Sequence, residues 1–144
     1  MASLGTTTTG LGDGRIDNFI IDTSVHLTMG VLVVAAMVAA TILVARHAWR
    51  AEPIDRLAGG SLVVAQVALA VQLLLGIKLL DQGQGIVQLY IHYVGGMLPL
   101  GAFLVGGWFA RGEDARSSRM LAALLLVGTL SAVMAFTIGR AYAN

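Results

Sequence analysis

Two histidines occupy matching positions in two hydrophobic segments of this 144-residue sequence, and imidazole is a common metal ligand. His26 precedes Arg46 by 20 residues, and His92 precedes Arg111 by 19 residues. If both segments are parallel helices that end at these arginines, a rise of about 1.5 Å per residue puts the two rings within about 2 Å of one level. The spacing therefore predicts two imidazoles that can face each other.

Glycines follow both histidines at helical spacing. Gly30 comes four residues after His26 and Gly96 four residues after His92, so each glycine shares a helix face with an imidazole. A flat macrocycle could lie against such faces, and ligation of haem b by two histidines inside a helix bundle needs this arrangement. We therefore predict that His26 and His92 are the metal ligands and that Gly30 and Gly96 belong to the cofactor site. The alternative is that the histidines are interfacial and that the glycines serve close helix packing.

Three basic residues are expected at the same end of the bundle as these histidines. Lys78 and Arg140, together with Arg15, lie where haem propionates would have to reach the polar interface. Lys78 and Arg140 are therefore added to the predicted cofactor-binding residues.

Other polar residues have a structural and a functional interpretation. Asp22 could hydrogen-bond His26 or cap the first helix, and Gln66 and Gln72 could bond across helices or orient a cofactor. His47 lies at the opposite end of the first segment and is expected to be interfacial.

The composition excludes several functions. The sequence has no cysteine, which excludes disulfides, thiolate metal sites, iron–sulfur clusters and covalently attached c-type haem. No carboxylate lies inside a hydrophobic segment, so no buried proton relay or general acid is visible, and we expect the chain not to be an enzyme on its own. A net charge of +1 with 12% charged residues argues against a nucleic-acid partner.

The elements that must position the histidines are transmembrane helices. The chain is 57% hydrophobic with a mean hydropathy of +0.82, which is typical of a membrane protein. Apolar runs cover about residues 24–45, 57–80, 86–110 and 120–139, each long enough to span the hydrocarbon as a helix. The short polar connections predict an all-α, up-down bundle of four transmembrane helices. We expect a flexible external tail over residues 1–23 and a single domain over residues 24–144.

Basic residues predict the orientation of this bundle. Loops 46–56 and 111–119 carry most of the arginines, so they are expected in the cytoplasm and both termini outside it. The expected location is the cytoplasmic membrane of a bacterium, with the lipid bilayer as the first partner.

The segments VHLTMGVLVVAAMVAATILVAR, VQLLLGIKLL and IHYVGGMLPLGAFL together resemble one half of the haem A synthase family. These integral-membrane enzymes modify haem during cytochrome oxidase biogenesis, and each half is a four-helix bundle in which paired histidines hold a haem from the outer side. The resemblance runs from His26 to Gly107 and implies that His26 and His92 are axial ligands. This chain departs from the family in having one half, no glutamate near the histidines and no cysteine pair in an outer loop.

Three functions follow as hypotheses. The first is a b-type cytochrome-like membrane protein that serves electron transfer or haem handling with a respiratory complex. The second is a cofactor-free accessory or scaffold subunit of a larger respiratory or photosynthetic membrane complex. The third is a haem-modifying enzyme, similar to haem A synthase, that acts as a homodimer.

Overall fold

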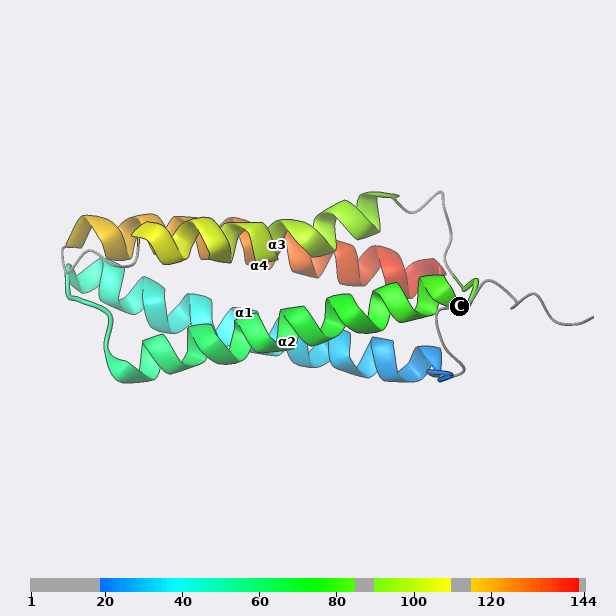
Figure 1. Cartoon of the computed structure of the whole chain (residues 1–144). Helices are drawn as coiled ribbons and strands as arrows, with labels where there is room; N and C mark the ends of the chain where they lie inside the picture. Colours follow the sequence, from blue (N-terminus) through cyan, green and yellow to red (C-terminus); the bar gives the residue numbers. More distant parts are fainter. Residues whose placement is uncertain (1–18, 85–89, 110–114, 143–144) are drawn as a thin grey trace, which may run out of the picture.

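The computed structural model describes residues 19–84, 90–109 and 115–142, and these form four helices that run alternately up and down (Figure 1). The helices are α1 (Thr23–Arg50), α2 (Arg56–Asp81), α3 (Tyr90–Phe109) and α4 (Ala115–Tyr142). The start of α1 and the end of α4 lie at the same end of the bundle. The expected all-helical, four-helix architecture is confirmed. Residues 1–18 of the expected tail lie outside the described residues.

Three of the helices are long and apolar enough to cross a membrane. They are α1, α2 and, within α4, the segment Arg116–Ala141. The apolar part of α3 among the described residues, Tyr90–Gly106, is shorter. The predicted third run begins at residue 86 and ends at 110, and residues 86–89 and 110 lie outside the described part of the chain.

The first and fourth helices extend beyond the apolar runs that predicted them. Helix α1 continues past residue 45 to Arg50, so the expected loop 46–56 is reduced to residues 51–55. Ala51 adopts a left-handed backbone (φ 55°) and closes the last turn through hydrogen bonds to carbonyls of α1, and Pro53 follows. Helix α4 similarly begins at Ala115, before residue 120. Hydropathy predicts the apolar part of a helix, whereas capping residues determine where the helix ends.

Three of the four neighbouring helix pairs pack extensively. Helix α1 contacts both α2 and α4 along the bundle, and α3 contacts α4, whereas α2 and α3 touch much less. The bundle is thus two hairpins, α1–α2 and α3–α4, joined mainly through α1 and α4.

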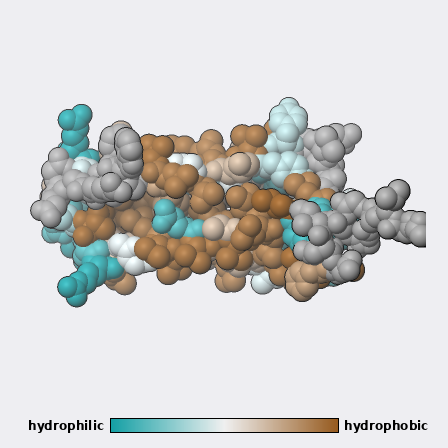
Figure 2. Space-filling view, in the orientation of Figure 1, coloured by the Kyte–Doolittle hydropathy of each residue, from teal (hydrophilic) through white to brown (hydrophobic). Residues whose placement is uncertain are grey.

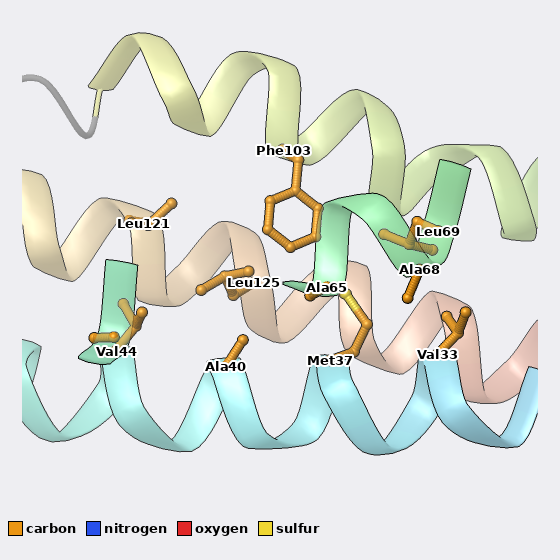
Figure 3. Packing of buried hydrophobic residues seen from close by; sticks show 11 residues of the cluster. Val33, Met37, Ala40, Val44, Ala65, Ala68, Leu69, Phe103, Leu121 and Leu125 are labelled. Carbon is orange, nitrogen blue, oxygen red and sulfur yellow. The ribbon is translucent and has the colours of Figure 1, made fainter. Parts of the chain in front are cut away.

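The packed core occupies the middle of the bundle and the end opposite the termini. Figure 3 shows side chains from all four helices meeting there, among them Met37, Ala65, Phe103 and Leu125. Small residues of α2 (Ala58, Ala65 and Ala68) let its backbone approach the larger residues of α1.

The outer surface between the two ends is apolar. Figure 2 shows hydrophobic side chains across the middle of the visible face and hydrophilic ones toward the ends. Large apolar residues on every helix point outward, including Ile42, Leu74, Leu104 and Leu130. Such a surface is far more apolar than the surfaces of water-soluble monomers, and it suits contact with lipid.

Pro99 lies inside α3 and is buried against α4. Because proline has no N–H, the carbonyl of Gly95 lacks the donor that position 99 would normally supply. The Ser131 hydroxyl of α4 donates to that carbonyl at 2.8 Å. A side chain of the neighbouring helix therefore satisfies the group that the proline leaves open.

Candidate functional site

The bundle brings His26 of α1 and His92 of α3 together at the end that carries the termini. Their ring centroids lie 6.2 Å apart, and the ring planes are inclined by 67°. Both side chains are half-buried. The depth count from the arginines thus predicted a real juxtaposition.

The ring of His92 rests on the backbone of α4. Its Nδ1–H donates to the carbonyl of Ala135 at 2.7 Å. One turn further along, a Cβ at Gly139 would lie only 2.8 Å from Cε1 of His92, so the glycine leaves the room that the ring occupies. With its proton on Nδ1, His92 carries its lone pair on Nε2, for which the described residues provide no hydrogen bond.

The ring of His26 lies against α2 in a comparable way. The Gln72 amide Nε2 is 3.1 Å from Nε2 of His26, and since the amide nitrogen donates, the imidazole nitrogen accepts. A Cβ at Gly76 would lie 3.3 Å from Cε1 of His26. Two buried atoms of this pair, His26 Nδ1 and Gln72 Oε1, have no hydrogen-bond partner in the described part of the chain.

The two hairpins therefore position their histidines through the same arrangement of a glycine and a hydrogen-bonding residue on the second helix. In each, a histidine on the first helix is followed after four residues by a glycine, and its ring lies against a glycine of the second helix. The residue four positions before that second glycine, Gln72 or Ala135, supplies the hydrogen bond. The hairpins differ in one respect, because α2 uses a side-chain amide where α4 uses a backbone carbonyl.

A cavity of about 530 Å³ opens beside the two rings, within the usual size of small-molecule sites of about 300–1,000 Å³. All four helices line it, and its wall is mostly apolar. At Gly96 an added Cβ would meet nothing within 4 Å, so this glycine borders open space. At Gly30 it would meet the Phe136 ring at 3.0 Å and the Gln72 amide at 3.4 Å, so this glycine makes room for neighbouring side chains as well as lining the cavity.

Of the basic residues that the sequence placed near the cofactor, the structure puts one in the cavity wall. Arg140 lines the cavity. Lys78 is not among the lining residues, and its amino group pairs with the Asp81 carboxylate at 2.7 Å. Arg15 lies outside the described residues.

Asp22 is a helix cap. Its carboxylate accepts the Ser24 N–H at 2.7 Å, and hydrogen bonding by the Ser24 side chain and backbone lowers the pKa of Asp22. The capping alternative therefore describes the structure, and the alternative of a bond to His26 does not.

His47, which was expected to be interfacial, lies in the last turn of α1 and is buried. Its Nε2 lies 3.4 Å from the Asp55 carboxylate and its Nδ1 lies 3.8 Å from that of Glu52. The side chain ties the end of α1 to the start of α2, at the end of the bundle opposite the cavity.

Sequence reasoning did not single out Ala135 and Gly139 of α4. Ala135 acts through its backbone carbonyl, which no residue type reveals. Gly139 was detectable in principle, because Ala135 and Gly139 share the four-residue spacing of Gln72 and Gly76.

Within the part of the chain that the structure describes, no group of three or more histidine or carboxylate side chains is placed to hold a metal ion. Any metal at this site would thus depend on the two imidazoles, as the iron of a macrocycle does. Comparison with protein-family models, with curated proteins and with solved structures found no match.

Proposed function

We propose that the chain is a membrane b-type cytochrome-like protein that holds haem between α1 and α3, for electron transfer or haem handling with a respiratory complex. The observation that carries this proposal is the pair of facing imidazoles, 6.2 Å apart at the edge of a cavity.

The geometry of the rings fits such a cofactor. Bonds of about 2 Å from one metal to a nitrogen of each ring would put the ring centres roughly 6 Å apart. The hydrogen bonds assign the proton of His92 to Nδ1, and an imidazole that donates from one nitrogen while ligating through the other is the usual metal-binding arrangement. The unpartnered polar atoms of His26 and Gln72 further favour a site for a ligand.

Each residue would have a definite role. When bound, haem would supply one-electron chemistry, and His26 and His92 would hold its iron. The Ala135 carbonyl orients His92 and increases its basicity, and the cavity wall, which includes Val33, Leu69 and Phe136, excludes water from the ring. Arg140 is the cation available to a propionate.

The proposed setting is the bacterial cytoplasmic membrane. The apolar outer surface supports insertion in a bilayer, and the arginines near the α1–α2 connection and at the start of α4 support a cytoplasmic location for that end. The cavity then belongs to the outer leaflet.

An absorption spectrum of the purified protein tests the proposal. The protein, expressed in cells that make haem, is expected to show a Soret band with the sharp α and β bands of low-spin iron. His92→Ala should abolish or displace these bands, whereas His47→Ala, which changes a histidine at the opposite end, should leave them in place. A wild-type protein without a Soret band, or a spectrum that His92→Ala leaves unchanged, would contradict haem binding and favour a cofactor-free accessory subunit.

A further inference from the structure

We infer that the two histidines are unequal ligands, and that Gln72 is a positioning residue which makes His26 the exchangeable one. This inference rests on the proposed haem site. It assigns His92 as the fixed ligand, and it assigns to the His26 side the position at which a small external ligand can bind.

His92 is held in one orientation by groups that cannot move away. The acceptor of its Nδ1–H is a backbone carbonyl of α4, and Gly139 shapes the gap in which the ring sits. Its Nε2 has no competing donor among the described residues. A ring fixed in this way keeps its ligating nitrogen aimed at the cavity, with no cost to release it from a partner.

His26 has neither a hydrogen-bond acceptor for Nδ1–H among the described residues nor an Nε2 that is free of a competing donor. Its Nδ1 is buried, and none of the residues that the structure describes accepts from it or strengthens this imidazole as a ligand. Its Nε2, the nitrogen that must ligate, already accepts a hydrogen bond from the Gln72 amide at 3.1 Å. An iron atom and the Gln72 amide therefore compete for the same lone pair.

Gln72 remains close whichever partner holds that lone pair. Its amide nitrogen lies near Gly30, since a Cβ at that position would be only 3.4 Å away, and the side chain lines the cavity. With a diatomic ligand in place of His26, Nε2 of His26 would be free of the iron, and the Gln72 N–H would donate to that nitrogen as it does in the structure. Gln72 thereby stabilises the state in which His26 is detached, and no electron or proton is transferred.

Carbon monoxide binding to the reduced, haem-loaded protein tests this inference. Gln72→Leu removes the amide at nearly constant volume, so we expect it to bind carbon monoxide more weakly by roughly fivefold, the equilibrium equivalent of one ordinary hydrogen bond. Gln72→Met is the second variant should the leucine variant fold poorly. Gln66→Leu makes the same change on the same helix outside the cavity lining and should leave the affinity unaltered.

Single histidine variants give a second, independent readout. His26→Ala should keep haem through His92, shift the reduced spectrum to the high-spin form and bind carbon monoxide at least as tightly as the wild type. His92→Ala should lose most of its haem. Equal carbon monoxide affinities in the wild type and both Gln72 variants, no carbon monoxide binding by the wild type, or haem retained better without His92 than without His26 would each overturn the inference while leaving the haem site intact. Absence of haem from the wild type would overturn both proposals.

Discussion

The ring of His92 fits against α4 because residue 139 has no side chain. A Cβ there would be 2.8 Å from Cε1 and 3.0 Å from Nδ1, too close for the ring to stay on the Ala135 carbonyl. We expect Gly139→Ala to destabilise the protein by about 1–3 kcal/mol, the usual cost of overpacking, and to weaken the Soret band. Unfolding in detergent and the absorption spectrum measure the two effects.

Gly101→Ala is the matched control for this substitution. A Cβ at Gly101 would meet nothing within 4 Å, and the residue lies on the helix that carries His92. Alanine favours a helix interior over glycine by about 1 kcal/mol in soluble hosts, so this variant should be neutral or slightly stabilised. If both alanine variants behave alike, the space at Gly139 does not position His92.

A second prediction at the residue scale concerns Ser131, which serves the carbonyl that Pro99 leaves without a donor. Ser131→Ala should cost about 1 kcal/mol, the net value of one interhelical hydrogen bond. In a Pro99→Ala background the new N–H at position 99 can reach Gly95 itself, so the same serine substitution should cost much less. A double-mutant cycle of unfolding free energies measures this difference, and additive effects would show that the serine acts on something else.

Individual residues could be predicted from the sequence where the side chain itself identifies the chemistry. His26 and His92 were found because imidazoles are rare and their distances from the arginines could be counted. Ala135 could not be found, because its function resides in a backbone carbonyl that every residue has. The rotation of each helix about its axis was also unknown, so the sequence left open whether Gly30 serves a cofactor or close packing. In the structure Gly30 lines the cavity and makes room for Phe136 and Gln72.

At the scale of the elements, the start of α2 depends on Asp55. Its carboxylate accepts the Ala58 N–H at 2.7 Å, and this hydrogen bond, with a smaller effect of nearby His47, keeps the pKa of Asp55 below its ordinary value of 3.8. A carboxyl whose pKa is lowered by folding stabilises the folded state above its ordinary pKa. That contribution disappears as the pH falls through the lowered value.

Asp55→Ala should therefore lower the stability of the bundle at neutral pH. The difference from the wild type should shrink in acid, below the lowered pKa of Asp55. Asp55→Asn retains an acceptor for the Ala58 N–H and should stay close to the wild type. Unfolding measured at neutral and acidic pH checks the trend, and a deficit for Asp55→Ala that does not shrink in acid would argue against the capping role.

The helices themselves were predictable, and their ends were less so. Apolar runs located all four, because apolar residues dominate each helix. The runs placed the end of the first helix at residue 45, whereas α1 continues to Arg50. Charged residues readily occupy a helix that extends beyond an apolar span, and the stop comes from Ala51 and Pro53. Lys78 was predicted at the cofactor from its end of the bundle alone, and the structure shows its amino group paired with Asp81 three residues later.

At the scale of the whole molecule, the orientation in the membrane can be tested because the chain has no cysteine. Single cysteines at the exposed positions Glu52 and Gln84 lie at opposite ends of the bundle. In intact cells we expect a membrane-impermeant maleimide to label Gln84→Cys and to label Glu52→Cys only after the cells are lysed. The opposite pattern would place the arginine-rich end outside.

The core and the cavity divide the long axis of the bundle between them. Side chains from Val33 to Val44 of α1, with their partners on the other helices, fill the interior over roughly 16 Å of helix rise. Val33 and Leu69 belong both to this packed stretch and to the cavity wall. This packed core separates the imidazoles from the opposite end of the bundle. An ion, proton or small molecule would therefore reach them from the end that carries the termini or between neighbouring helices. The cavity is therefore closed by apolar side chains on the side that faces the opposite end of the bundle.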